Sequence, residues 1–165
     1  LDKNLDRLRH LDQICVGRTT TLASNRGSIE RALVDADLVV GAVLVAGARA
    51  PIVVSEDMVR SMKPGSVIVD VAVDQGGCIE TCKPTTHENP VYTVDGILHY
   101  CVANMPGAVP QTSTQALTQA TLPYALLISN HGFETACEKN EALNKGLAIK
   151  NGQLLDNGLA TLFNL

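Results

Sequence analysis

The sequence contains no tryptophan, and aromatic residues make up only 3% of its 165 residues. No apolar run reaches the roughly 18 residues of a membrane-spanning helix, so we expect no membrane partner. The net charge is -4 and lysine and arginine do not cluster, which leaves no electrostatic basis for binding nucleic acid. No N-terminal stretch has the pattern of a secretory signal peptide.

The five cysteines are an odd number and are scattered along the chain. Without a secretion signal, this usage predicts reduced thiols and a cytoplasmic protein. Cys78 and Cys82 have the loose spacing of half a metal site, for which His87 or His99 would be further ligands. No second close cysteine pair accompanies them, and the spacing is wide for zinc, so we expect no metal centre.

Apolar, β-branched runs alternate with segments of helical periodicity through the first two thirds of the chain. This alternation predicts βαβ units with right-handed crossovers, and therefore an α/β fold with a doubly wound, mostly parallel sheet of Rossmann type. The predicted strands are 18–23, 37–44, 67–73 and 97–102, the predicted helices are 5–11, 25–34 and 55–62, and residues 75–96 are expected to form a long loop.

The glycine-rich G-x-G-x-x-G turn of a dinucleotide-binding domain is absent from the chain. That turn lies about 20 residues before the acidic residue that ends the second strand. Leu1-Asp2 resembles the end of such a second strand. The first residue is also Leu rather than Met. We therefore expect a piece of a longer protein that lacks the first strand and the glycine loop. The sheet would then have an unpaired edge or a hole, and an unpaired edge invites pairing with another chain.

The last third of the sequence has a different pattern. Residues 112–128 are apolar at helical spacing, although Pro123 should bend that helix or mark its boundary. Residues 134–145 predict one or two short helices. Asn151-Gly152 predicts a tight hairpin turn within residues 147–155, because this pair readily adopts positive φ. Asp156 is placed to cap a final helix.

Asp74 stands out as a candidate for proton chemistry. Residues 67–73 resemble a strand buried on both faces, and Asp74 would follow it at the carboxyl edge of the sheet, where open α/β folds bind their ligands. Gly76 and Gly77 have no Cβ, so backbone and ligand can approach closely there. Capping of a turn is the alternative role for Asp74, and the spacing alone does not decide between the two.

Asp2 has two possible roles as well. At the end of a second strand its carboxylate would accept hydrogen bonds from the adenosine ribose and repel a 2′-phosphate, which favours NAD over NADP. Alternatively, it only caps the helix that follows. Residues 41–47 contain two glycines and either line a cofactor cleft or simply end a strand.

The segment after the last predicted strand offers further candidates at the same sheet edge. Asn104 has both a donor and an acceptor, and Met105 can pack against a flat ring. The chemistry alone favours the simpler interpretation, in which Asn104 is a turn residue near Pro106.

Three segments strongly resemble bacterial L-alanine dehydrogenases: residues 70–78, 83–87 and 100–114. The most specific parts are Asp74-Gln75-Gly76-Gly77-Cys78 and Ala103-Asn104-Met105-Pro106. The resemblance extends over the whole chain. The NAD-binding subunit of proton-translocating transhydrogenase is similar in fold but differs at the second of these two motifs.

This resemblance implies an oxidoreductase that uses NAD to convert L-alanine to pyruvate and ammonium, with Asp74 as the catalytic acid/base. It also implies cofactor-binding and substrate-binding positions. These are Asp2, Arg7 and Ser24 at the adenosine end, Val43, Leu44 and Val71 along the cleft, and Val102, Met105 and the substrate-binding Asn104 at the nicotinamide corner.

The resemblance further implies that residues 1–110 are a partial NAD-binding domain. Residues 111–165 would return to the substrate domain and to subunit contacts, in a family that usually forms hexamers. The glycine loop and the substrate-binding domain of the family are not in this chain, so we expect the chain alone to be inactive. Two alternatives remain: a non-catalytic NAD(H)-binding module of transhydrogenase type, and a purely structural fragment of an oligomer.

Overall fold

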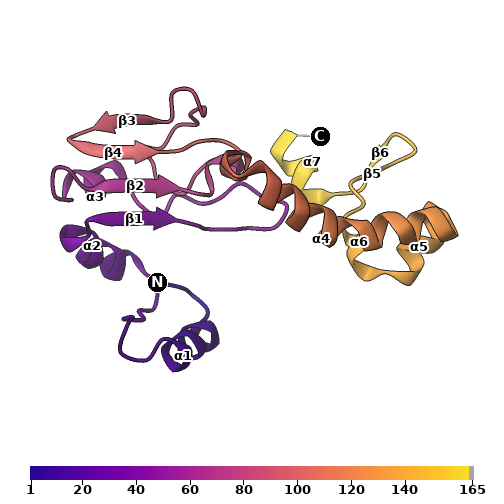
Figure 1. Cartoon of the computed structure of the whole chain (residues 1–165), viewed down its shortest axis with the longest axis horizontal. Helices are drawn as coiled ribbons and strands as arrows, with labels where there is room; N and C mark the ends of the chain where they lie inside the picture. The colour runs from indigo at the N-terminus through magenta and orange to yellow at the C-terminus, as the bar shows by residue number, and fades with distance from the viewer. Residues whose placement is uncertain (164–165) are drawn as a thin grey trace. The chain divides into compact units, whose positions relative to one another are not determined.

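The structure, a computed structural model, describes residues 1–163, the side chain of Leu162 excepted (Figure 1). The chain divides into two compact units. Unit 1 comprises residues 1–44 and 49–103 and contains the main sheet, whereas unit 2 comprises residues 45–48 and the chain from residue 104 onward. Each unit is described by itself below.

Unit 1 is built on a four-stranded sheet in the order β1-β2-β4-β3. Its strands are β1 (Leu38–Gly41), β2 (Val67–Asp70), β4 (Ile97–Tyr100) and β3 (Val91–Val94). The pairs β1–β2 and β2–β4 are parallel, and β3 is antiparallel to β4. The prediction of an α/β fold with a mostly parallel sheet is therefore confirmed.

Three helices complete unit 1: α1 (Leu5–Ile14), α2 (Arg26–Asp35) and α3 (Glu56–Arg60). Each begins at a residue whose side-chain oxygen accepts a hydrogen bond from a backbone N–H of the first turn. These N-caps are Asn4, Asn25 and Ser55. Such caps satisfy donors that a helix leaves without an intrahelical partner, which is why the helices begin at these residues.

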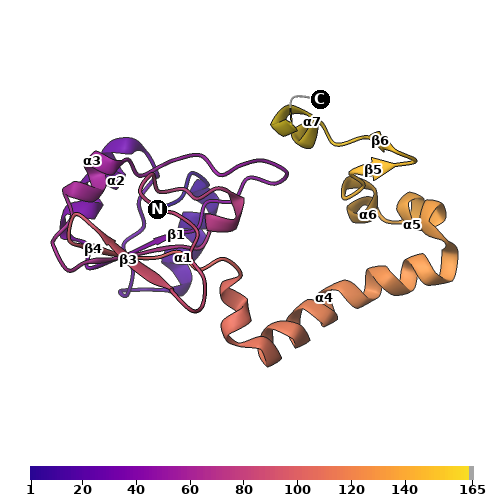
Figure 2. The same ribbon diagram turned by 90° about the horizontal axis from the view of Figure 1, so that it is seen from above.

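The sheet is covered on one face by α2 and α3, which lie on the same side of it (Figure 2). Beneath them Ile68 and Ile97 are fully buried. On the opposite face Val40 is 56% exposed and Leu98 is 37% exposed. The prediction that the strand of residues 67–73 is buried on both faces is therefore wrong for this chain, since its side chains alternate between buried and partly exposed positions.

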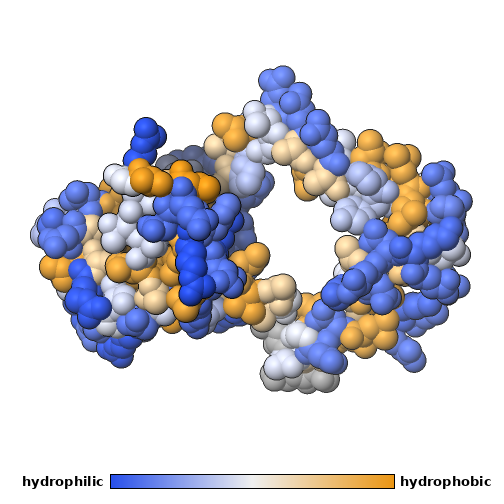
Figure 3. All heavy atoms as spheres, turned by 90° about the horizontal axis from the view of Figure 1, so that it is seen from below, coloured by the Kyte–Doolittle hydropathy of each residue, from blue (hydrophilic) through white to orange (hydrophobic). Residues whose placement is uncertain are grey.

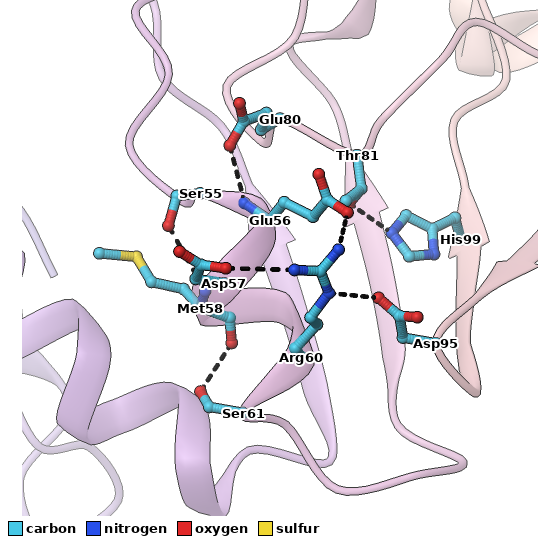
Figure 4. A network of polar contacts seen from close by, with 10 residues as sticks. All are labelled: Ser55, Glu56, Asp57, Met58, Arg60, Ser61, Glu80, Thr81, Asp95 and His99. Carbon is cyan, nitrogen blue, oxygen red and sulfur yellow. Dashed lines mark hydrogen bonds and ion pairs between the residues drawn. The ribbon is translucent and has the colours of Figure 1, made fainter.

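Helix α3 is tied to the turn between β3 and β4 by ion pairs (Figure 4). The Arg60 guanidinium contacts Asp95 at 3.2 Å and also Glu56 and Asp57 within α3. The Glu80 carboxylate accepts a hydrogen bond from the Glu56 backbone N–H at 2.8 Å. These groups lie at the surface, so the network orients the helix end more than it stabilises the fold.

Strand β3 lies inside the segment that was predicted to be a long loop. The missed signal is Asp95-Gly96, in which both residues have positive φ (50° and 80°). This geometry is that of the tight turn that matches the twist of a two-stranded hairpin. A second correction concerns residues 18–23, where only an isolated parallel bridge between Ala23 and Asp2 replaces the predicted strand.

Strand β2 ends at Asp70, earlier than predicted, because the Asp70 side chain redirects the chain. Its carboxylate has no exposed surface. It accepts backbone N–H bonds from Ala72 at 2.9 Å, Cys78 at 2.8 Å and Ile79 at 3.2 Å. A buried charge is costly unless hydrogen bonds replace its water, and these three donors do so. The segment from 71 to 79 consequently folds around one carboxylate.

Unit 2 consists mainly of helices, as the sequence predicted. Its elements are η2 (Met105–Ala108), α4 (Pro110–His131), α5 (Phe133–Lys139), α6 (Glu141–Lys145), β5 (Ile149–Lys150), β6 (Gln153–Leu154) and α7 (Asn157–Phe163). The β5–β6 hairpin turns at Asn151-Gly152, and α7 is capped by Asp156, both as expected. Helix α4 continues through Pro123, so that residue does not mark a boundary.

Helix α4 has no buried residue and carries exposed apolar side chains such as Leu117 and Leu126. Figure 3 shows apolar residues in orange at the surface of both units. None of the helices within residues 1–163 is both long and apolar enough to cross a membrane.

The Asp70-centred turn makes a testable prediction at Gly77. Gly77 has φ of +75°, and a Cβ there would lie 3.1 Å from the Asp70 Oδ2 atom. Gly77→Ala should therefore lower the free energy of unfolding by about 2–4 kcal/mol, since it combines backbone strain with crowding of a buried carboxylate. Urea unfolding measures this change.

The matched control is Gly17→Ala. Gly17 has φ of +69°, but a Cβ added there would meet no other atom within 4 Å. Gly17→Ala should lower the free energy of unfolding by only about 1 kcal/mol, which is the cost of the strained backbone. Equal losses for the two variants would contradict a tight fit around Asp70.

Candidate functional site

The carboxyl edge of the sheet is formed where the parallel strands β2 and β4 end side by side. After β2, Val71 continues the pairing, because its N–H donates to the Gly41 carbonyl at 2.8 Å. A short 3₁₀ turn, η1 (Val73–Gln75), follows. Asp74 lies on this turn rather than directly after a strand, and its side chain is exposed, as is Val71.

The second side of this edge is the segment after β4. Val102 forms a parallel bridge with Thr85 and has no exposed surface, so its cofactor contact stays a prediction. Asn104, the first residue of unit 2 in this segment, has φ of 54° and ψ of 52° and precedes the turn η2, which contains Met105. The left-handed conformation of Asn104 confirms its role as a turn residue, and its substrate contact stays a prediction.

The residues predicted for the adenosine end come together near the N-terminus. The Ser24 N–H donates to the Asp2 carbonyl at 2.9 Å, and the Asp2 N–H donates to the Leu22 carbonyl at 3.3 Å. The Asp2 carboxylate accepts a bond from the Asn4 N–H at 2.9 Å. Arg7 lies one turn into α1, where its N–H donates to the cap Asn4. The cap of α1 is therefore Asn4, and the alternative prediction that Asp2 caps this helix is wrong. The Asp2 carboxylate is exposed, and its contact with a ribose stays a prediction.

A cavity of about 430 Å³ lies beside β1 in unit 1. Its wall includes Leu1 and Ser24 on one side and the whole of β1 on the other, and it reaches Val43 beyond the end of β1. β1 is the last strand of the sheet on this side, so its outer backbone edge has no strand partner among the described residues. The unpaired edge or hole expected from a missing first strand stays a prediction. Leu44, by contrast, is highly exposed and outside this wall.

The sequence analysis missed Asp70 as the residue that organises this edge. A carboxylate within an apolar, β-branched run is the signal that would have found it, because such a group must be buried with partners.

The candidates for a metal site have other partners. The Cys78 thiol donates to Asp70 Oδ1 at 3.5 Å, and His99 bonds to Thr81 and to the Ile97 carbonyl. Within residues 1–163, no three Cys, His, Asp or Glu side chains lie close enough together to hold a metal ion.

Comparison with known proteins gives one consistent family. A family model described as "Alanine dehydrogenase/PNT, C-terminal domain" matches residues 1–157. An alanine dehydrogenase from Halomonas elongata is 51% identical over 165 residues, which are 100% of this chain and 44% of that protein. The chain thus spans less than half the length of this curated relative.

Solved structures agree with the sequence comparison. A structure titled L-alanine dehydrogenase is similar over 99% of this chain and 45% of its own, with a TM-score of 0.84 and 50% identity. A transhydrogenase from Sinorhizobium meliloti is similar over 56% of this chain and 27% of its own, with a TM-score of 0.51 and 30% identity. The sheet with its Asp70-centred turn, together with these matches, places the chain in the alanine dehydrogenase/PNT C-terminal domain family.

Proposed function

We propose that the whole protein to which this chain belongs oxidises L-alanine with NAD⁺ to pyruvate, ammonium and NADH. The observation that carries this proposal is the 50% identity to the L-alanine dehydrogenase structure over 99% of the chain. The transhydrogenase match is weaker and covers 56% of the chain. That difference favours the catalytic function over the non-catalytic NAD(H)-binding module.

The residues present suit a dinucleotide. The exposed Asp2 carboxylate beside Ser24 can accept bonds from a ribose diol, and Ser24 and Val43 line the same cavity. The apolar remainder of that wall and the open edge of β1 suit a further parallel strand better than a phosphate group. We therefore assign to this place the strand and glycine loop that the chain lacks, supplied by the rest of the whole protein.

Bound NAD⁺ supplies the acceptor for the hydride that leaves the alanine Cα. This chain contributes proton transfer to the reaction, through Asp74. When water adds to the carbon of the resulting iminium, a proton must leave that water, and the carboxylate of Asp74 accepts it. The same group then returns that proton to the amine nitrogen, the C–N bond breaks as the hydroxyl oxygen forms the carbonyl of pyruvate, and the hydroxyl proton passes to the leaving ammonia, which becomes ammonium. Its position on an exposed turn at the carboxyl edge gives a small amino acid access to it.

The proposal also assigns residues 1–110 to NAD binding and residues 111–165 to the substrate domain and subunit contacts. The exposed apolar side chains of α4 support this second assignment, because exposed apolar side chains in this number favour burial in an assembly. A hexamer and a cytoplasmic location stay predictions.

Asp74→Asn in the whole protein tests the catalytic assignment. Alanine-dependent NADH formation, followed by absorbance, should fall about 10²–10⁴-fold, because a general acid/base contributes an effect of that size. NADH affinity should change by less than about twofold, since the amide keeps the shape of the side chain. Asp12→Asn, which removes an exposed carboxylate from α1, should leave turnover unchanged. Undiminished turnover in Asp74→Asn would remove this residue from the mechanism.

Asp2→Asn tests the choice of cofactor. The amide oxygen can still accept the bond from Asn4, but it no longer repels a 2′-phosphate. The preference for NAD⁺ over NADP⁺, measured as the ratio of kcat/KM values, should fall at least about tenfold, which corresponds to about 1.4 kcal/mol. Asp6→Asn on α1 is the control and should not change the ratio. An unaltered ratio in Asp2→Asn would leave Asp2 with only its local bond to Asn4.

The chain alone should neither form NADH from alanine nor bind NADH tightly, because it contains no glycine loop for the pyrophosphate. Fluorescence titration with NADH measures the second property. Adding the remaining part of the whole protein in trans should restore both. Tight binding by the chain alone would contradict the assignment of the loop to the rest of the protein. Binding in the whole protein without alanine-dependent reduction would favour the transhydrogenase-type module.

A further inference from the structure

The side chain of Arg49 lies against the turn that carries Asp74. Gly76 follows that turn, and a Cβ added at Gly76 would lie 2.6 Å from the Cγ atom and 3.0 Å from the Cδ atom of Arg49. The arginine side chain therefore occupies the space that a side chain at residue 76 would need. Glycine at this position lets Arg49 pack directly on the backbone.

A backbone hydrogen bond joins the same two segments. The Ala50 N–H donates to the Gln75 carbonyl at 2.9 Å. Ala50 is only 4% exposed and belongs to the hydrophobic core of unit 1. The segment that brings Arg49 to the turn is therefore anchored in the core.

This contact falls on a part of the turn that Asp70 does not hold. The hydrogen bonds of Asp70 go to N–H groups before and after η1. Between them, the Gly76 N–H donates to the Val73 carbonyl at 3.0 Å, and this bond closes the backbone around Asp74. Arg49 thus covers the residue that closes the turn.

The packing on Gly76 is made by the stem of the arginine. The atoms of Arg49 nearest to the added Cβ are Nε, Cγ and Cδ. The residue is exposed, and no ion pair described for residues 1–163 includes it. Long cationic side chains commonly cover a surface with their stem while the charged group stays in water. The contact therefore depends on the shape of the stem rather than on the charge.

We propose that Arg49 is a positioning residue for Asp74, because its stem holds the end of the turn from which the Asp74 carboxylate projects. The inference rests on the proposed function, since it assumes proton transfer by Asp74. Without the stem, residues 75 and 76 lose their cover while the bonds of Asp70 remain. The backbone that directs the carboxylate is then less constrained, and a displacement of about 1 Å can lower a rate by about 10²-fold.

Arg49→Ala in the whole protein tests the inference by kinetics. The kcat of alanine-dependent NADH formation should fall about tenfold, whereas the KM for alanine and the affinity for NADH should change by less than about twofold. Arg49→Met keeps a stem of similar shape without the charge, so it should retain at least about half of the kcat. Arg18→Ala is the control, because it removes an exposed arginine from the segment after α1, and it should leave kcat unchanged.

A double-mutant cycle measures whether Arg49 acts through Asp74. Asp74→Asn removes the group that is to be positioned. In that background Arg49→Ala should change kcat by less than about twofold, because residues that act as a unit are not additive. An equal loss from Arg49→Ala in both backgrounds would overturn the inference.

Amide hydrogen exchange, followed by mass spectrometry, provides a measurement that does not depend on activity. In Arg49→Ala the peptide that contains residues 73–77 should exchange at least about tenfold faster, because the hydrogen bonds of the turn open more often. The same peptide should keep its protection in Arg49→Met and in Arg18→Ala.

The positioning role and the proposed function can therefore fail separately. Unchanged exchange in Arg49→Ala would overturn the positioning role. A loss of kcat in Arg49→Met as large as in Arg49→Ala would also overturn it and would assign the effect to the charge. Faster exchange in Arg49→Ala together with full turnover in Asp74→Asn would instead overturn proton transfer by Asp74, while the hold of Arg49 on the turn would stand.

Discussion

The buried carboxylate of Asp70 determines the path of the chain beyond the central strand of unit 1. A carboxylate without exposed surface must replace its lost water with hydrogen bonds, and the donors nearest in sequence are the N–H groups of the following turn. Ala72, Cys78 and Ile79 supply them. The strand therefore ends at Asp70, and the chain then reverses so that the N–H groups of residues 78 and 79 bind the Asp70 carboxylate.

The position of the candidate site depends on this turn. The part of the turn that projects is η1, which carries Asp74 at the surface. The part that returns packs Ile79 into the core. One buried carboxylate thus places the group proposed for proton transfer and anchors the segment that follows it. Buried charges are poor sources of stability, but here the charge specifies a single conformation of the loop.

Local patterns in the sequence were sufficient for most elements but not for this turn. The cap at Asp156 and the turn at Asn151-Gly152 act through bonds or dihedral angles within a few residues, so the sequence alone predicted them. Asp70 acts over eight and nine residues, and its partners are backbone groups that any sequence would offer. The contact between Thr81 and His99 needs strand order and register, which no local pattern contains. The hairpin turn at Asp95-Gly96 has a local sequence signal, but the sequence analysis did not predict it.

The residues of the candidate site could likewise be predicted from the sequence, but their exposure and their positions relative to one another could not. The resemblance to a family named the positions, but exposure and neighbours decide what each side chain can do. Val102 has no exposed surface, whereas Asp74 is accessible to a small substrate. The Asp2 carboxylate accepts a local bond from the Asn4 N–H and is still exposed. A local backbone bond and ligand binding are therefore not exclusive roles for a carboxylate, since its two oxygens together accept several hydrogen bonds.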